Sequence, residues 1–520
     1  MQANDMIEAE NSEHALTRRA AALTLARTIA FAMSFVLPLI LVRTLSQMNF
    51  GLYKQVFQIL TSAVALPGLG LSTSAYYFMP RKPDKKAQIA MNVLIFYFLV
   101  GTVIAILFAV YPGWVLLVFK EGELMPYIPL LGLACMLWLL SSFLETVTVA
   151  DGDIRSAFIF SIVLQIAKVS LLLMAGAWLG SIRAIVWAAV VQGILQCLIL
   201  FFYLRKRYGQ FWRAFDTGLF KVQLAYALPF GLSGLAATVQ GDLHNYFVSH
   251  YFNPAMFAIY AVGCFQLPLL LVLLDSVGSV IIPEFAKLEM KKDHQAIINL
   301  WFAAVRRVAF FFLPVCGLLF VMRYEFIISL FTSSYLDAIP VFIINLFYMV
   351  LFVNLTGAVI LAFDDLKFFR LKLYLALIPV TALALYFGIK SAGLVGAISA
   401  VVLVRALDIL INVSVLRRRL GMSMNDLKLL APIFRMLTAV ALAIVAAMAV
   451  KPFATHLIAF IQLLIGSAVF GFVYLTGALV LGAVTKEERD SFRSWAVRLY
   501  SQCAVCIRLS SVLRINPSTR

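Results

Sequence analysis

The amino-acid sequence predicts an all-α, polytopic membrane protein with about fourteen transmembrane helices, arranged as two pseudo-symmetric six-helix bundles plus two extra helices. The first observation is composition, since 63% of the residues are hydrophobic and only 13% are charged, about half the charged fraction of ordinary soluble domains. The second is a series of apolar runs of about twenty residues, each long enough to cross the hydrocarbon core of a bilayer. The third is an internal repeat.

The repeat relates the two predicted bundles. Residues 150–209 align without a gap to residues 362–421, at a constant offset of 212. A second, shorter match occurs at an offset of 207. Both copies begin on the same side of the membrane, so we expect parallel repeats about an axis along the membrane normal, with substrate bound between them. The matched residues are Asp153 with Asp365, Arg155 with Lys367, Arg205–Arg207 with Arg417–Arg419, and Phe50 and Tyr53 with Phe257 and Tyr260.

The basic residues predict the orientation. Segments on the N-terminal side of the predicted spans hold 28 of the 42 Lys and Arg residues, whereas the opposite loops hold 7. This bias places both termini in the cytoplasm. The net charge of +17 then needs no nucleic-acid partner, because anionic membrane lipids account for it. The predicted spans start near Leu23, Tyr53, Ile89, Tyr127, Ser156, Ala184, Gln223, Ala255, Asn299, Ile339, Arg370, Ala392, Ala431 and Leu457.

The spans define five predicted segments. Their order is a cytoplasmic N-terminal segment, two bundles, two additional helices and a basic tail whose apolar residues recur at helical spacing, as in helices that lie on a membrane surface. The boundaries are 1–22, 23–216, 217–428, 429–484 and 485–520.

Motifs typical of enzymes and metal sites are missing from the sequence. It contains no GxxxxGK[ST], HExxH or GxSxG motif. Cys503 and Cys506 form a single CxxC without a second pair, which is a weak metal signal. We therefore predict no catalytic residues, no cofactor and no metal site.

Ionisable residues inside the predicted spans are the candidate site residues. Each costs about 2.5–3.5 kcal/mol at the centre of a bilayer, so each should face a cavity or a partner. Arg27, Lys168, Asp242 and Asp275 have no opposite charge within one helical turn. Two of the four are cationic, which favours an anionic ligand over a cationic drug.

Other intramembrane polar residues have simpler explanations. Arg405 and Asp408 stand at i,i+3 spacing and are predicted to form a structural ion pair. His244 is either a core histidine hydrogen-bonded to a neighbouring helix or a cavity residue beside Asp242. Prolines at 38, 67, 229 and 268 make spans 1, 2, 7 and 8 the candidates for bending.

Several stretches together resemble the Wzx-type polysaccharide flippases, which carry lipid-linked oligosaccharides and belong to the multidrug/oligosaccharidyl-lipid/polysaccharide exporter superfamily. The resemblance covers roughly residues 23–482. Members typically have an Asp followed at once by Arg in span 7, whereas here Asp242 is followed by Leu243 and His244. The stretches are "FGLYKQVFQILTSAVALPGLGLSTSAYYFMPR" (50–81), "GDLHNYFVSHYFNPAMFAIYAVG" (241–263), "VGSVIIPEFAKLEMKKD" (277–293) and "GLVGAISA" (393–400).

The resemblance implies a function and a site. It implies a secondary transporter of the bacterial inner membrane that turns polyprenyl-pyrophosphate-linked oligosaccharides to the outer leaflet, through a cationic central cavity. Arg27 and Lys168 would supply the cations, beside Asp242 and His244, and Asp242 or Asp275 would couple transport to a proton or sodium gradient. The implied partners are the lipid-linked anionic oligosaccharide, membrane lipids, a polysaccharide polymerase and a chain-length regulator.

Two other functions remain open from the sequence. A multidrug or metabolite cation antiporter of the same superfamily would have an acidic cavity. A membrane enzyme that modifies polysaccharides, such as an acyltransferase, would use His244 in catalysis.

Overall fold

The computed structural model describes residues 28–30, 32–119, 122–423 and 425–483. This part of the chain is helical and contains no strand, which confirms the predicted all-α class. Arg27, Cys503, Cys506, the N-terminal segment and the basic tail lie outside the described residues.

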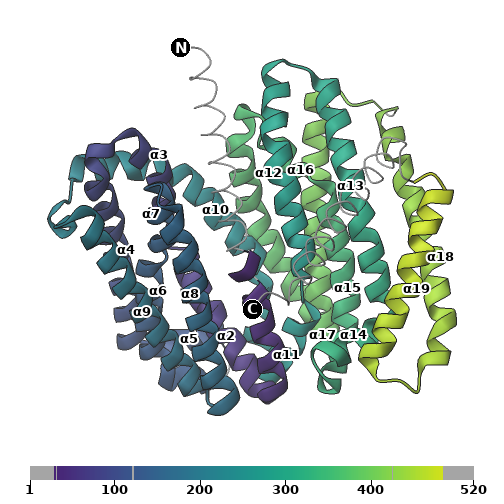
Figure 1. The fold of residues 1–520 in the computed structure, drawn as a ribbon, viewed down its shortest axis with the longest axis horizontal. Helices are drawn as coiled ribbons and strands as arrows, with labels where there is room; N and C mark the ends of the chain where they lie inside the picture. The colour runs from purple at the N-terminus through teal and green to yellow at the C-terminus, as the bar shows by residue number, and fades with distance from the viewer. Residues whose placement is uncertain (1–27, 31, 120–121, 424, 484–520) are drawn as a thin grey trace, which may run out of the picture.

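The first half of the chain forms one lobe, which we call the N-lobe (Figure 1). It opens with a helix over Thr28–Thr44. The helices that follow are α2 (Gln47–Ala65), α3 (Ser74–Arg81), α4 (Lys86–Val110), α5 (Val115–Val118), α6 (Ile128–Ser141), α7 (Phe143–Ala150), α8 (Ile154–Leu173) and α9 (Ile182–Tyr208).

The second half forms the C-lobe, with the last two helices on its outer flank (Figure 1). Its helices are α10 (Thr217–Tyr251), α11 (Pro254–Gly263), α12 (Pro268–Met290), α13 (His294–Val321), α14 (Arg323–Leu330), α15 (Ile339–Val350), α16 (Thr356–Ile360), α17 (Lys367–Leu420), α18 (Ala431–Val450) and α19 (Ala459–Val480).

Ten helical segments of the described chain are long and apolar enough to cross a membrane, or eleven if the bent α10 counts as one span. The count of fourteen stays a prediction, because some predicted spans are short or broken. The span predicted from Ala255 is divided into α11, which ends at Gly263, and α12, which begins at Pro268. Proline suits a first helical position, because no intrahelical partner exists there for an N–H. Conversely, α17 contains the non-helical residues Ala392 and Gly393 where we predicted a new span.

The two lobes share local structure at matched positions. Ser46 caps α2 by accepting from the Asn49 N–H, and Asn253, 207 residues later, caps α11 by accepting from the Met256 N–H. Such caps fix where a helix begins.

The longer matched segments, residues 150–209 and 362–421, also end in similar ion pairs. Arg207 binds Asp151 in the N-lobe, and Arg419, 212 residues after Arg207, binds Asp365 in the C-lobe, two residues beyond the position that matches Asp151. Each arginine connects the end of its segment to the turn at the beginning of the same segment.

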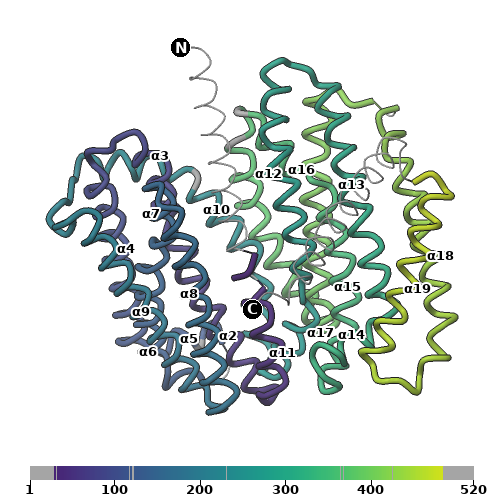
Figure 2. The backbone as a smooth tube through the Cα atoms, viewed as in Figure 1, coloured from purple at the N-terminus to yellow at the C-terminus, as the bar shows by residue number. Residues whose placement is uncertain are grey.

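The lobes meet closely at one end of the molecule, the end predicted to face outward. There α2 and α11 lie side by side (Figure 1). The approach requires glycine, because a Cβ built on Gly51 would lie 1.8 Å from the carbonyl oxygen of Pro254. Gln47 Nε2 donates to the Ser334 carbonyl at 2.5 Å across the same contact. At the opposite end the two lobes diverge (Figure 2).

Helix α10 belongs to both lobes. Its first part, Thr217–Pro229, is bent by 43° from Gly231–Tyr251. The first part is bound to the N-lobe, where the buried Gln223 accepts from Asn92 at 2.8 Å and donates to Ser74 at 3.1 Å. The second part packs along α17 of the C-lobe. The bend therefore lies where the helix passes from one lobe to the other, at the proline that removes a backbone hydrogen bond.

We predict that Gly51→Val opens the contact between α2 and α11, because the added side chain overlaps the Pro254 backbone. In a background without native cysteines, disulfide formation between Gln47→Cys and Ser334→Cys should fall at least about fivefold. The matched control is Gly234→Val in α10, where a Cβ meets nothing within 4 Å. Equal cross-linking in the two glycine variants would contradict the prediction.

We also predict that Asp151→Asn destabilises the protein by about 1.5–3 kcal/mol, the usual contribution of hydrogen bonds to a charged group. The Asp151 side chain is 1% exposed and lies 2.7 Å from Lys86 Nζ and 2.5 Å from Arg207 Nε. The control is Asp365→Asn, whose pair with Arg419 is solvent-exposed and should contribute less than about 1 kcal/mol. Unfolding in a denaturing detergent, followed by circular dichroism, measures both.

The contacts of Asp151 with Lys86 and Arg207 also make the stability depend on pH. Burial alone would raise the pKa of Asp151, but the hydrogen bonds and charges of Lys86 and Arg207 outweigh it, so the pKa lies below its usual value. A carboxyl whose pKa is lower in the folded state stabilises the protein above its unfolded pKa, and this stabilisation is lost as the pH falls through the folded pKa. The wild type should therefore lose stability below about pH 4. Asp151→Asn should lose less stability over the same pH range, because asparagine does not titrate.

Candidate functional site

A cavity of about 470 Å³ lies between the lobes. One wall is α2 of the N-lobe, and the other is formed by the second part of α10, by α11 and by the turn after it. Its volume falls within the range of roughly 300–1,000 Å³ typical of small-molecule sites. Its polar side chains are Lys54, Gln58 and Thr61 from α2, Asp242, His244 and Asn245 from α10, and Gln266.

Lys54 is the cation of this inter-lobe cavity, and sequence reasoning missed it. The predicted span began near Tyr53, which placed Lys54 at the membrane surface, where a lysine extends into water at little cost. The structure begins α2 at Gln47, so Lys54 lies about two turns inside the helix. Its Nζ is 5.5 Å from the centre of the Phe50 ring, and it forms no ion pair within the described residues. The capping signal at Ser46 would have revealed the earlier start.

Lys54 also lines a second, smaller inter-lobe cavity of about 250 Å³. The two cavities have Lys54, Ala261 and Gln266 in common. Lys54 therefore borders two adjoining spaces between the lobes.

Asp242 lines the larger inter-lobe cavity, as its position in a predicted span led us to expect. Its carboxylate makes no hydrogen bond or ion pair with any residue that the structure describes, and it is half-buried. A carboxylate in this environment is stabilised by a proton, a cation or water in the cavity.

His244 fits both explanations offered from the sequence. Its Nδ1 is 2.8 Å from the hydroxyl of Tyr260, a fully buried residue of α11, so it is hydrogen-bonded to a neighbouring helix. It also lines the inter-lobe cavity. The imidazole thus connects the cavity wall to the core of the C-lobe.

Gln58 adds an unfilled hydrogen-bonding site. Its side-chain Nε2 and Oε1 are buried and have no hydrogen-bond partner among the described residues, although the residue lines the inter-lobe cavity. A buried amide without partners costs free energy, and the side chain would have to turn toward the cavity before a ligand or water could satisfy it.

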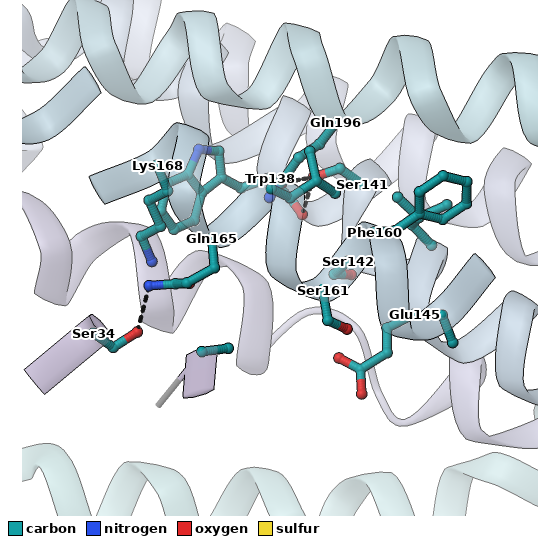
Figure 3. A pocket seen from close by; sticks show the side chains of 14 residues that line it. Ser34, Trp138, Ser141, Ser142, Glu145, Phe160, Ser161, Gln165, Lys168 and Gln196 are labelled. Atoms are coloured by element: carbon teal, nitrogen blue, oxygen red, sulfur yellow. Dashed lines mark hydrogen bonds between the residues drawn. The ribbon is translucent and has the colours of Figure 1, made fainter. Parts of the chain in front are cut away.

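Lys168 lies in a different place. It lines a separate cavity of about 400 Å³ inside the N-lobe, between α6, α7, α8 and α9 (Figure 3). Its Nζ is 4.8 Å from the Trp138 ring centre and 5.6 Å from that of Phe57. The structure therefore does not bring Lys168 together with Asp242 and His244. Phe57 lies between them, because its ring contacts Lys168 and it also lines the larger inter-lobe cavity.

The remaining predicted residues have other positions. Asp275 is exposed on α12 and lines none of these three cavities. Arg405 Nη1 lies 2.7 Å from Asp408 Oδ2, and Asn412 donates to the other carboxylate oxygen at 2.8 Å. Arg27 is outside the described residues. Among the described residues no group of His, Cys, Asp and Glu is arranged to hold a metal ion.

Solved structures share this fold. A structure of the lipid II flippase MurJ in an inward closed conformation matches with a TM-score of 0.62 at 13% identity, over 88% of this chain and 98% of that chain. An inward-facing multidrug resistance MATE family transporter of the MOP superfamily matches with a TM-score of 0.57 at 15% identity, over 77% and 98%. At these identities the likeness establishes the fold alone.

A third structure carries a description of its pocket. This MOP superfamily transporter from Pyrococcus furiosus, described as having a binding pocket of reverse polarity, matches with a TM-score of 0.53 at 16% identity, over 78% of this chain and 95% of that chain. Among curated proteins no match was found.

The family is established by sequence. The model of the family described as "Polysaccharide biosynthesis protein" matches residues 40–340, which is more than half of the 520 residues. This match confirms the resemblance stated from the quoted stretches, and the chain is a multi-pass membrane protein that belongs to the polysaccharide biosynthesis protein family.

Proposed function

We propose that this protein is a flippase that turns polyprenyl-pyrophosphate-linked oligosaccharides from the inner to the outer leaflet of the bacterial inner membrane, by alternating access between its lobes. The family match and the transporter fold support this proposal. The observation that carries it is the polar inter-lobe cavity with Lys54 in its wall.

The physical need for such a cavity follows from the substrate. A diphosphate and several sugars cannot cross the hydrocarbon core unaided, because each polar group that loses its water costs several kcal/mol unless it gains another hydrogen-bond partner. Lys54 offers a cation to the pyrophosphate, and Gln58, once its side chain turns toward the cavity, offers an amide to a phosphate or sugar oxygen. The polyprenyl tail stays in the bilayer throughout.

Alternating access fits the asymmetric contact between the lobes. The lobes touch where Gly51 meets Pro254, and they diverge at the end proposed to be cytoplasmic (Figure 2). In this arrangement the inter-lobe cavities would receive substrate from the inner leaflet. Both termini would then be cytoplasmic.

We propose Asp242 as the residue that couples transport to a proton or sodium gradient, because its carboxylate faces the same cavity as Lys54. Asp275 remains a second candidate on α12, and Arg27 a further cation of the substrate path. The polymerase and the chain-length regulator of the same polysaccharide pathway are the proposed protein partners.

A cation antiporter is the second candidate function. The observation that favours it is the carboxylate of Asp242, which has no ion-pair partner in the described part of the chain. An antiporter of this kind would use Asp242 to bind a cationic substrate rather than a coupling ion. The two functions predict opposite results for Lys54, since a cation exporter has no need of an ammonium group in its cavity.

We predict that Lys54→Met lowers surface polysaccharide at least about tenfold in a deletion strain, because the cavity loses its cation, while lipid-linked oligosaccharide accumulates at the inner membrane. Mass spectrometry of lipid extracts measures the accumulation, and immunoblotting confirms normal protein levels. Arg27→Ala and Asp242→Ala should also abolish complementation. The matched control is Lys390→Met, an exposed lysine outside the three cavities.

The alternatives give distinct results in the same strains. Unchanged polysaccharide together with altered drug sensitivity would identify a cation antiporter. Loss of sugar acylation with intact export in His244→Ala would identify a modifying enzyme.

A further inference from the structure

The N-lobe contains a polar cavity of its own, walled by α6, α7, α8 and α9 and by the helix over Thr28–Thr44 (Figure 3). Its volume of about 400 Å³ suits a small polar ligand. The side chains that matter are Ser141, Glu145, Ser161, Gln165, Lys168 and Gln196. We propose that this N-lobe cavity is a subsite for an acidic pyranose of the transported glycan, an inference that rests on the proposed flippase function.

The wall offers hydrogen bonds of the kind that a pyranose uses. Gln165 donates to Ser34 at 2.8 Å, and Ser141 donates to Gln196 at 2.8 Å (Figure 3). These bonds leave the Gln165 carbonyl and the Gln196 amino group available, and the Ser161 hydroxyl makes no hydrogen bond within the described residues. A ring of sugar hydroxyls both donates and accepts, so it matches this mixed set better than a phosphate does, which only accepts.

Lys168 supplies the preference for an acidic sugar. Its ammonium group packs against the Trp138 and Phe57 rings and has no carboxylate within ion-pair distance in the described part of the chain. Glu145 lies toward the other end of the cavity (Figure 3). A sugar carboxylate beside Lys168, with hydroxyls toward Ser161 and Glu145, places opposite charges together and keeps like charges apart.

The N-lobe cavity adjoins the proposed pyrophosphate site. Ser34 lines both the N-lobe cavity and the smaller inter-lobe cavity, and Lys54 lines that smaller cavity and the larger one. A glycan whose pyrophosphate lies at Lys54 can therefore extend past Ser34 into the N-lobe. One lysine would then receive the phosphate end and the other a sugar.

The test measures binding of soluble sugars to the purified full-length protein by isothermal titration calorimetry. The probes are trigalacturonic acid and the neutral trisaccharide maltotriose. We expect the wild type to bind trigalacturonic acid at least about tenfold more tightly, and Lys168→Met to remove that preference. Lys168→Arg should retain it, as should Arg155→Met, which removes an exposed cation from the same helix outside the cavities.

A second variant fills the cavity without changing its charge. Ser161→Leu should weaken binding of both sugars by at least about fivefold, and size-exclusion chromatography confirms that each variant is folded. A preference for trigalacturonic acid that persists in Lys168→Met but is lost in Lys54→Met would overturn the subsite. Displacement of trigalacturonic acid by equimolar inorganic pyrophosphate in the Lys54→Met variant would also overturn it, since pyrophosphate would then bind in the N-lobe cavity itself.

Failure of this inference differs from failure of the proposed function. Calorimetry measures binding without flipping, whereas complementation in the deletion strain requires flipping. A protein that complements but shows no Lys168-dependent preference has no such subsite and remains a flippase.

Discussion

A polar group inside a bilayer must find a partner within the protein, because hydrocarbon supplies none. Much of the described chain satisfies this constraint internally. Asp408 is held by Arg405 and Asn412, and Glu325 of α14 lies 2.8 Å from Lys451 after α18, which binds the added helices to the C-lobe.

Four charged residues of predicted or observed spans depart from that pattern. Lys54, Asp242, Lys168 and Asp275 have no ion-pair partner among the described residues. The first three line cavities, whereas Asp275 is exposed on α12. For Lys54, Asp242 and Lys168, the cost of an intramembrane charge is met by whatever enters those cavities.

The bent helix α10 reconciles this path with a movable pair of lobes. Gln223 fastens the first part of α10 to the N-lobe, and the Tyr246 hydroxyl in the second part donates to Ser62 of α2 at 2.5 Å. Separation of the lobes must break the second bond but can keep the first, provided that the helix flexes near Pro229. The absence of a backbone N–H at Pro229 makes that flexing less costly than in an uninterrupted helix.

The sequence predicted the fold class and the family because both depend on features that extend along the chain, namely apolar runs and a repeat. It also predicted the ion pair between Arg405 and Asp408, because a contact between residues three apart on one helix is a local property. It did not predict that Lys168 and Asp242 lie in different cavities, since that depends on how α2 packs against α6 of its own lobe and α11 of the other. Lys54 was missed for a local reason, a helix start displaced by six residues from Tyr53 to Gln47.

The charges of the inter-lobe cavity connect substrate with coupling ion under the proposed function. Lys54 and Asp242 line one cavity, so an anionic substrate is attracted by one and repelled by the other. When a proton or sodium ion neutralises Asp242, the repulsion disappears and the pyrophosphate binds more tightly. Linkage makes the effect reciprocal, because a bound pyrophosphate must raise the affinity of Asp242 for the cation by the same factor. The two charges thus link the two binding steps without any contact between the ion and the sugars. Outward flipping driven by an inward ion gradient further requires that the cation cross in the opposite direction, on the carrier that has released its glycan.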